Sequence, residues 1–394
     1  MARLGDLIEQ IRGVSYKPED VYDQLNENSI ALLRANNIKD GQLNFDDVIY
    51  VSRKRVHDNQ LLKAGDILIC TSSGSKELVG KAAYVQEDLP ITFGAFCKVV
   101  RPQKIRSDYL GHFFNSPNYR QKISASSAGA NINNIRNEHI DELEIVYPAA
   151  DRQEFVAVVL NKLTSLISLR KQQLAKLDEL VKARFVEMFG DLADPLCKYP
   201  KCTLADACTD PDNIKCGPFG TQLNKDEYQD TGVAVWEIPQ INSGFKTQPT
   251  HFLTAEKAKY LNAYSIIPGD IAMSRKGNVG KCGLFPENYE PGIIHSDVLR
   301  IRVDSKRVVP CFMMYQLHFS RAVQYQIEMV SSGAIMAGVN VTKLKQIEVY
   351  IPEYRLQIEF SGFVVKIERQ KLTIQQSLAK LEVLKKSLMQ EYFG

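Results

Sequence analysis

Apolar residues recur every seven positions in two separate stretches of the chain, which is the pattern of a long helix packed along one seam. In the first stretch the repeating residues are Leu160, Ile167, Leu174, Val181 and Met188, with Leu163 and Leu177 at the second seam position. In the second stretch they are Phe360, Ile367, Ile374, Leu381 and Leu388, supported by Val364, Leu378 and Leu384. Heptads sustained over this length predict coiled-coil helices over about residues 152–190 and 356–394.

Four basic residues interrupt these seams: Arg170, Arg184, Lys371 and Lys385. Long basic side chains can lie along an apolar surface and keep their charge in water, so they are compatible with a seam. The alternative is two amphipathic helices that each pack on their own globular domain. Helices of about 35 residues are long for ordinary packing, which favours a helix pair.

The chain also repeats itself at an offset of 204 residues. Residues 174–180, with the sequence LAKLDEL, recur as LAKLEVL at 378–384, and Gly65-Asp66-Ile67 recurs as Gly269-Asp270-Ile271. Gln153 matches Gln357 in the same register, whereas Gly80-Lys81 and Gly280-Lys281 are displaced from it by four residues. The repeat predicts a duplicated unit, a globular domain followed by a long helix, with a loop-length change between the copies.

Short strand patterns and helical candidates alternate inside each copy, which predicts an α+β fold. We expect two similar globular domains, residues 1–150 and 193–353, joined by a central helix at 151–192 and a distal helix at 354–394. The first helix must lead from domain one to domain two, and the second must return. The two helices are therefore expected to form an antiparallel coiled coil with an internal pseudo-twofold axis, a spacer on the order of 50 Å long.

Composition narrows the class of protein without fixing it. The chain has 44% hydrophobic and 24% charged residues, as in globular proteins, and a net charge of only +3. It has no apolar run of membrane-spanning length and does not begin like a secretory signal, so we expect a cytoplasmic protein. Its eight cysteines include no C-x-x-C pair, which favours reduced thiols over a zinc site.

Motifs for catalysis are absent from the sequence. The chain has no Pro-Pro dipeptide and therefore lacks the Asn/Asp-Pro-Pro-Tyr/Phe motif of adenine methyltransferases. The glycine-rich segment 74–82 resembles a P-loop, but it has five residues between its glycines, and Ala82 replaces the magnesium-binding Ser or Thr. These features predict a non-catalytic protein with no cofactor or metal of its own.

Basic and amide side chains instead gather in turns rich in glycine and serine. Arg and Lys in such turns can contact phosphates or guanine edges, and Asn and Gln can pair with adenine edges. Any single one of them could equally be an ordinary solvated surface residue. Their presence in both copies favours DNA binding. The candidates are Arg53, Lys54, Arg55, Lys76, Lys81 and Arg136 in domain one, and Lys215, Gln222, Arg275, Lys276 and Lys281 in domain two.

The chain resembles the specificity subunits of type I restriction–modification enzymes along essentially its whole length. In domain two the resemblance lies in residues 214–223 (IKCGPFGTQL), Tyr228, Gly232 and 268–271, and in domain one in residues 11–18 (IRGVSYKP), 65–68 and 80–81. Pro148 and Pro352 precede a helix in each copy, as in family members. Domain one departs from domain two because it lacks the Gly-Pro-Phe-Gly turn, so its loop must be built differently.

The resemblance implies two target recognition domains that each bind one half of a split DNA site, with the helices setting the gap between the halves. It implies double-stranded DNA, two methyltransferase subunits and restriction/translocase subunits as partners, and places S-adenosylmethionine, ATP and magnesium on those partners. We expect partner contacts on the helices, at Leu160, Ile167, Leu174, Val181, Ile367, Ile374, Leu381 and Leu388. Two alternatives remain, a single-chain modification enzyme or nuclease, and a coiled-coil protein–protein scaffold without a DNA role. A salt-dependent DNA affinity would separate the scaffold from a DNA-binding protein.

Overall fold

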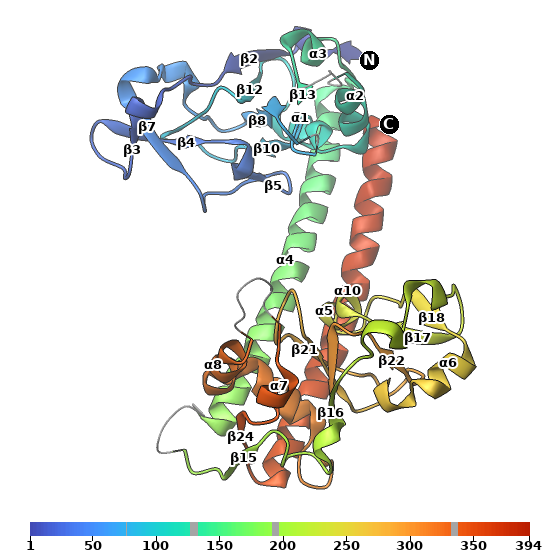
Figure 1. Cartoon of the computed structure of the whole chain (residues 1–394). Coiled ribbons are helices and arrows are strands. Elements are labelled where there is room, and N and C mark those ends of the chain that lie inside the picture. Colours follow the sequence, from blue (N-terminus) through green and yellow to red (C-terminus); the bar gives the residue numbers. More distant parts are fainter. Residues whose placement is uncertain (76, 127–132, 191–196, 332–337) are drawn as a thin grey trace. The chain divides into compact units, whose positions relative to one another are not determined.

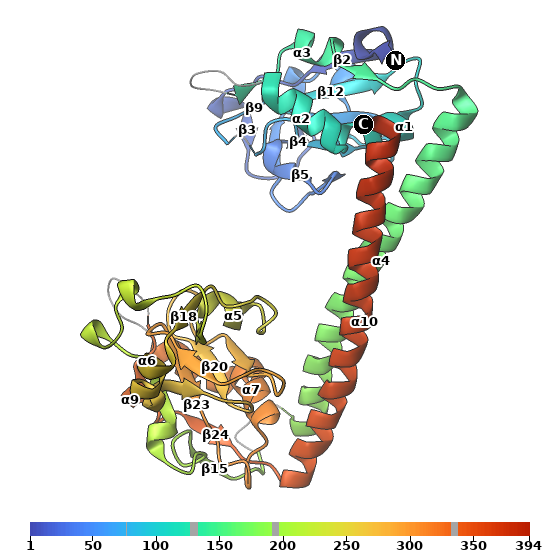
Figure 2. The same cartoon turned by 90° about the vertical axis from the view of Figure 1, so that its right-hand side faces the viewer.

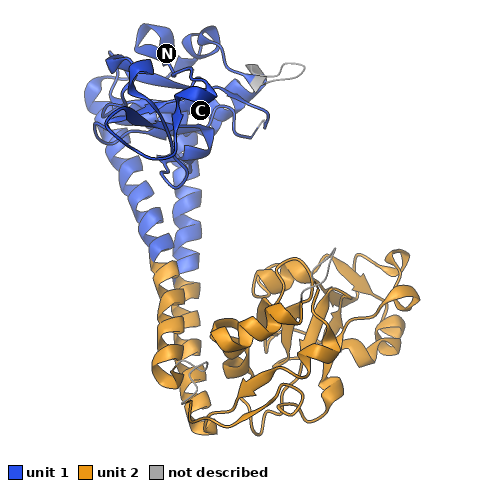
Figure 3. Ribbon diagram, turned by 60° about the vertical axis from the view of Figure 1, so that its left-hand side comes forward, with its two compact units in different colours: residues 1–172, 374–394 blue, residues 173–373 orange. Residues whose placement is uncertain are grey.

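The computed structural model describes residues 1–75, 77–126, 133–190, 197–331 and 338–394. It divides into two compact units, residues 1–172 with 374–394, and residues 173–373 (Figure 3). The division falls inside two long helices, α4 (Ala150–Phe189) and α10 (Tyr354–Phe393), which are each 40 residues long. Each unit therefore contains one globular body and one stretch of both helices.

Unit 1 is built on two four-stranded sheets. The first is antiparallel, in the order β10-β8-β12-β2, and the second runs β11-β4-β7-β3 with β11 parallel to β4. Along the buried strand β8, Ile67 and Ile69 join one apolar core, and Leu68 and Cys70 join another, because successive side chains point to opposite faces. The elements are β1 (Ala2–Arg3), β2 (Ile8–Arg12), β3 (Val21–Tyr22), β4 (Ser29–Leu33), β5 (Ile38–Lys39), β6 (Gln42–Leu43), β7 (Ile49–Ser52), β8 (Ile67–Cys70), β9 (Ser72–Ser73), β10 (Ala82–Tyr84), β11 (Ile91–Phe93), β12 (Cys97–Pro102), β13 (Asn133–Asn134), β14 (Glu144–Ile145), α1 (Ser107–Phe114), α2 (Pro117–Ser126) and α3 (Asn137–Asp141).

Unit 2 repeats this plan. Its antiparallel sheet has the order β21-β20-β23-β16, and its second sheet runs β18-β17-β22-β19 with β17 parallel to β22. The elements are β15 (Lys201–Thr203), β16 (Ile214–Cys216), β17 (Val233–Trp236), β18 (His251–Leu253), β19 (Ser265–Ile266), β20 (Ile271–Ser274), β21 (Cys282–Leu284), β22 (Gly292–Ile294), β23 (Val298–Ile301), β24 (Glu348–Tyr350), α5 (Ile238–Asn242), α6 (Ala255–Tyr260), α7 (Pro310–Phe319), α8 (Arg321–Met329) and α9 (Val341–Leu344).

Buried polar contacts repeat between the units as the sequence does. The Asp66 carboxylate accepts two hydrogen bonds of 2.8 Å from the Arg101 guanidinium, and Asp270 accepts two of 2.7 Å from Arg302. Both aspartates are almost completely buried, so each needs this bidentate partner. The pairs hold the loop before a central strand against the neighbouring strand of the same sheet.

The four-residue displacement in the repeat is a loop of different length. The Gly80 N–H donates to the Cys70 carbonyl in unit 1, and the Gly280 N–H donates to the Ser274 carbonyl in unit 2. Cys70 and Ser274 keep the 204-residue offset, whereas the two glycines are 200 residues apart. The segment after the central strand is therefore four residues longer in unit 1.

Within each unit, α4 and α10 lie side by side and run in opposite directions (Figures 1 and 2). In unit 1, Leu160 of α4 packs in one core with Met389 of α10, and Lys171 pairs with Glu382. In unit 2, the rings of Phe185 and Phe360 are 5.4 Å apart. The expected α+β fold with long paired helices is confirmed.

Two of the four basic residues in the seam, Lys371 and Arg184, form ion pairs on the helices. Lys371 Nζ lies 2.7 Å from carboxylate oxygens of both Asp178 and Glu368. Arg184 pairs with Glu359 on the facing helix at 2.9 Å. Burial lowers the pKa of Lys385.

None of the described helices combines the length and the hydropathy needed to cross a membrane.

Candidate nucleic-acid interface

A glycine shapes the loop that follows β16 in unit 2. A Cβ atom on Gly217 would lie 2.3 Å from the carbonyl oxygen of His295, so only glycine permits this approach of two backbone segments. Two residues later, the Phe219 side chain is 50% exposed, although large aromatic side chains usually bury most of their surface. The close backbone contact therefore places an exposed aromatic ring at a defined position.

Arg275, directly after β20, lies against that ring. Its guanidinium carbon is 4.9 Å from the Phe219 ring centroid, within the range of a cation–π contact. Its Nε atom donates to the Val339 carbonyl at 3.2 Å. Among the described residues, none accepts a hydrogen bond from its two Nη atoms. The Phe219 ring and the Val339 carbonyl thus hold the Arg275 side chain in place. Its two Nη groups are available to a ligand.

Gln222 and Lys215 join the same surface through Tyr264. Gln222 Oε1 accepts hydrogen bonds from the Phe219 N–H at 3.3 Å and from the Tyr264 hydroxyl at 2.9 Å. The Lys215 ammonium lies 5.5 Å from the Tyr264 ring centroid. We call these five residues the Arg275 platform. It brings together three of the residues predicted to bind DNA, from segments that are far apart in the sequence.

The two other candidates of unit 2 have different surroundings. Lys276 Nζ forms an ion pair with Asp297 at 2.9 Å, so this carboxylate compensates its charge. Lys281 lines a separate pocket with His318 and Glu328. Burial and the nearby Lys281 lower the pKa of His318. The predicted cations of unit 2 therefore do not form one continuous patch.

In unit 1, carboxylates compensate two of the three clustered cations that follow β7. Arg53 pairs with Asp58 at 3.2 Å, and Arg55 pairs with Asp20 at 2.9 Å. Lys54, between them, is exposed and has no ion pair among the described residues. A phosphate would have to compete with an aspartate for either arginine.

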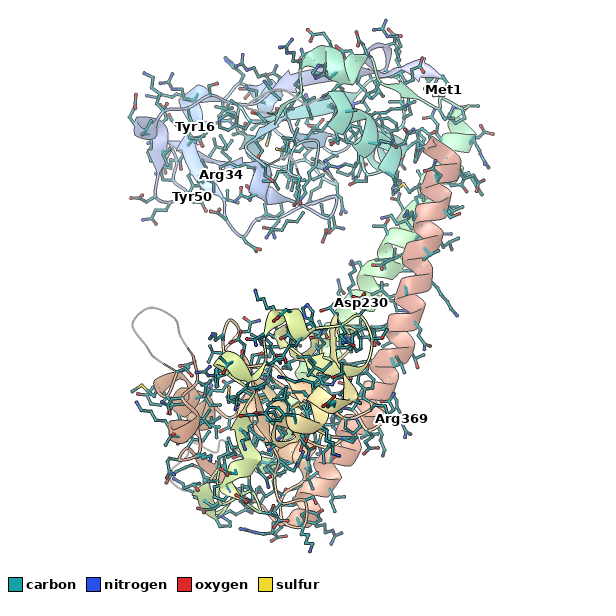
Figure 4. All side chains as sticks on the ribbon, turned by 45° about the vertical axis from the view of Figure 1, so that its right-hand side comes forward. Met1, Tyr16, Arg34, Tyr50, Asp230 and Arg369 are labelled. Atoms are coloured by element: carbon teal, nitrogen blue, oxygen red, sulfur yellow. The ribbon has the colours of Figure 1, made fainter. Side chains whose placement is uncertain are left out.

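Tyr50 of β7 lies in the same lobe of unit 1 as Tyr16 and Arg34 (Figure 4). Arg34 pairs with Asp47 at 2.9 Å, so it too is already neutralised. Tyr16 and Tyr50 are half-buried, and Arg34, like Arg53 and Arg55, already pairs with an aspartate.

The remaining candidates of unit 1 are Arg136, Lys81 and Lys76. Arg136 is exposed directly before α3, and Lys81 is half-buried before β10, where its carbonyl accepts from the Cys70 N–H. Lys76 lies outside the described residues. Among the described candidates of unit 1, no hydrogen bond or ring contact links them as Phe219 and Tyr264 link those of unit 2.

Comparison with known proteins gives long matches. Residues 1–179 match the family model for the type I restriction modification DNA specificity domain. The StySPI specificity subunit of Salmonella potsdam is 28% identical over 97% of this chain and 86% of its own length. The EcoKI specificity subunit of Escherichia coli K12 is 27% identical over the same shares. Over nearly its whole length the chain is similar to type I restriction enzyme specificity subunits.

Solved structures support the fold of this chain. The type I restriction–modification S subunit from M. genitalium matches with a TM-score of 0.60 and 14% identity, over 100% of this chain and 95% of the other. A chain from a structural study of type I R-M complex assembly matches with a TM-score of 0.57 and 14% identity, over 99% and 96%. At this identity the matches speak for the fold.

Two aromatic members of the platform were missed in the sequence. Phe219 stands inside the Gly-Pro-Phe-Gly turn, and Tyr264 lies 45 positions downstream of it in a short 3-10 helix at Asn262–Tyr264. An aromatic residue next to glycine and proline was the available signal for Phe219. No local pattern links Tyr264 to that turn.

Reasoning from the sequence also missed a buried lysine in unit 1. Lys98 of β12 is only 8% exposed, and its ammonium donates to Gln10 Oε1 at 2.7 Å and to Asn137 Oδ1. Gln10 in turn donates to Asp141 at 2.6 Å. Burial lowers the pKa of Lys98, and Asp141 and Glu138 oppose that change. This network ties β2 and β12 to α3, which Arg136 precedes.

The predicted partner contacts on the helices need a correction. Leu160, Val181 and Ile367 are at most 5% exposed because they pack into the apolar cores of the two units. A partner cannot reach these side chains while the helices stay packed. Ile167, Leu174, Ile374, Leu381 and Leu388 are half-buried.

Proposed function

We propose that this chain recognises a split DNA site, with unit 1 binding one half and unit 2 the other, and performs no chemistry itself. The observation that carries the proposal is the duplication of one α+β fold in a chain related to specificity subunits over 97% of its length. The two copies carry different side chains at equivalent loops, so the two half-sites should differ. The arrangement is a one-chain analogue of a dimer on a palindrome.

The partners in this proposal supply the chemistry. Two methyltransferase subunits would modify adenine, and restriction/translocase subunits would cleave DNA. S-adenosylmethionine, ATP and magnesium would bind to those subunits. The chain would work where these partners and DNA are, in the cytoplasm.

Side chains on the outer faces of the helices suit such partners better than the buried seam does. Leu166, Leu169 and Leu180 of α4 are between 43% and 53% exposed. On α10, Leu372 is 56% and Val383 69% exposed. The spacing of Leu166, Leu169 and Leu180 places them on one face of α4, and apolar side chains grouped on one face are typical of surfaces that another protein covers. A Leu169→Glu variant should therefore lose a methyltransferase subunit in a pull-down, whereas Lys176→Glu, at an exposed position of the same helix, should retain it.

Genome-wide mapping of N6-methyladenine tests the proposal directly. Cells with the intact gene should methylate one motif made of two different half-sites around a fixed gap. Deletion should abolish methylation of that motif, and the restored gene should return it. Shortening both helices by one heptad should shift the preferred gap.

A coiled-coil scaffold without a DNA role predicts other outcomes. The methylation map would then be the same in intact and deleted strains in which the methyltransferase is expressed. Duplex DNA affinity would also lack the steep salt dependence that phosphate contacts produce. Both results together would refute the DNA-binding function.

A further inference from the structure

The geometry points to Arg275 as a residue that recognises guanine, positioned by Phe219 and the Val339 carbonyl on a surface that presents hydrogen-bond donors. This inference rests on the proposed function and specifies the half-site of unit 2. The Gln222 amide and the Lys215 ammonium complete the donor set.

The hydrogen-bonding capacity left on Arg275 matches the major-groove edge of guanine. Its Nε atom is occupied by the Val339 carbonyl, and Phe219 covers one region of the guanidinium. The two Nη groups keep donors that no described residue uses. Guanine presents two acceptors, N7 and O6, in the major groove, and a bidentate arginine is their commonest partner. Because its side chain is held before binding, Arg275 loses less conformational entropy when it binds a base.

The hydrogen bonds of Gln222 fix the direction of its amide. The Phe219 N–H can only donate, so the atom it meets must be the amide oxygen. The Tyr264 hydroxyl donates to the same oxygen, which fills its second lone pair. Bidentate pairing with adenine needs the amide to accept and donate together. Gln222 therefore presents its Nε2 donors, and the expectation that it pairs with adenine is replaced by contact with an acceptor such as guanine or thymine.

Unit 1 lacks the platform at the equivalent positions. Gly13 and Gly217 make the same close approach, to the carbonyl oxygens of Gly94 and His295, so Ser15 is the counterpart of Phe219. The carbonyls of Thr71 and Arg275 accept from the N–H groups of Ile135 and Val339, so Thr71 is the counterpart of Arg275. Recognition of guanine by this mechanism should be confined to the half-site of unit 2.

Selection from a library of randomised DNA duplexes tests the inference, with the full chain purified together with its associated subunits. The wild-type protein should select a split motif with a guanine in one half. Arg275→Ala should lose the preference at that guanine, by roughly 5- to 150-fold, and keep the other positions. Arg275→Lys should keep overall affinity yet lose the same preference, because a lysine retains the charge and not the fork.

A base analogue identifies the contacted atom. Replacing that guanine by 7-deazaguanine, which lacks N7, should weaken wild-type binding and leave Arg275→Ala unchanged. Inosine, which keeps N7 and O6, should bind the wild-type protein as guanine does. Equal effects of 7-deazaguanine on both proteins would overturn the assignment.

Variants of Phe219 test whether its ring positions Arg275 or only adds contact area for DNA. Phe219→Ala should weaken the preference at the same guanine, and Phe219→Tyr should restore it. Phe45→Ala removes a phenylalanine of unit 1 that is also 50% exposed, and should leave the preference at this guanine unchanged. A uniform loss of affinity for all sequences in Arg275→Ala would make it a phosphate contact and overturn the inference. A wild-type protein that selects no motif would refute the proposed function itself.

Discussion

Unit 1 and unit 2 share a backbone plan and differ in how they use it. The contacts that hold the plan are the same in both, namely the buried aspartate–arginine pair and the glutamines Gln153 and Gln357, whose oxygens accept the N–H groups of Arg106 and Val309. At the loop after the central strand the side chain differs, since Thr71 in unit 1 corresponds to Arg275 in unit 2. The comparison teaches that the scaffold tolerates exchange where a ligand would bind.

The difference extends into the interior. Lys98 pairs in the sheet with Ile69, and Leu299 pairs with Met273, two positions that keep the 204-residue offset. Gln10 and Asn137 around Lys98 correspond by the same offset to Ile214 and Val341. One scaffold therefore holds a hydrogen-bonded lysine in one copy and an apolar cluster in the other.

Placing a lysine at the position of Leu299, or a leucine at that of Lys98, tests this difference, and Leu299→Lys should have the largest effect on stability. Leu299→Lys would bury an ammonium among apolar side chains that offer it no acceptor, which should destabilise the protein by roughly 3–5 kcal/mol. Trp236, the single tryptophan, is buried in unit 2 and reports urea unfolding of that unit by fluorescence.

The reverse exchange is the matched control. Lys98→Leu leaves Gln10 and Asn137 without their donor but also removes a buried charge, so the cost should be about 1–2 kcal/mol. It is followed by far-UV circular dichroism. Equal costs for the two variants would show that the polar network of unit 1 does not accommodate lysine specifically.

Removing one partner of the shared ion pair should have the next largest effect. Asp270→Ala leaves the Arg302 guanidinium unpaired and takes an acceptor from the Ile267 N–H, so we expect a loss of about 3 kcal/mol. This value is at the lower end of the roughly 3–5 kcal/mol expected when a buried ion pair loses one partner. We choose the lower end because the Arg302 side chain is 31% exposed. The urea midpoint reported by Trp236 should fall accordingly.

Two controls in unit 1 sharpen this test. Asp66→Ala removes the equivalent pair and should leave the Trp236 transition much less affected than Asp270→Ala does. Asp58→Ala removes the exposed partner of Arg53 and should cost at most about 1 kcal/mol in either unit. If Asp66→Ala lowered the Trp236 midpoint as much as Asp270→Ala, the two units would unfold as one.

Much of the fold could be predicted because it rests on periodicity. The heptads of α4 and α10 persist over many turns, and a repeat at 204 residues is visible without any structure. The four-residue displacement at Gly80 and Gly280 correctly indicated a loop-length change between the copies, since both glycines meet the carbonyl at the end of the central strand.

The site could be predicted only in part, because tertiary contacts decide which cations are available. Arg53 and Arg275 look alike in sequence, as basic residues that follow a strand. Asp58 compensates Arg53, whereas a carbonyl 64 residues away and an exposed ring hold Arg275. The heptad pattern identified the seam of the helices but could not show that Leu160 and Val181 face the cores, which leaves other faces for partners.

Acid should reveal a smaller difference between the units. Arg106 and Val309 are equivalent, because each N–H donates to the matching glutamine, Gln153 or Gln357. Six positions after them stand His112 in unit 1 and Tyr315 in unit 2. A side chain that titrates in unit 1 therefore corresponds to a ring whose centroid lies 5.5 Å from that of Phe360 in unit 2. His112 is buried, with its Nε2 atom 2.8 Å from Asn161 Oδ1. Burial lowers the pKa of His112 against the opposing effect of that hydrogen bond.

The unfolded chain therefore binds a proton on His112 more readily than the folded chain does. Stability from this site is complete above the unfolded pKa of about 6.5 and is lost as the pH falls through the lower folded value. As the pH falls, the backbone amides of α1 should exchange faster in the wild-type protein than in His112→Gln. The two proteins are compared at the same pH, so that the intrinsic chemical exchange rate cancels. The exchange of α7 should be the same in both proteins at every pH. Equal acid sensitivity of α1 in the wild type and in His112→Gln would assign the loss of stability to another group. A change confined to α1 would show that one buried side chain makes the two copies of the scaffold differ in their response to acid.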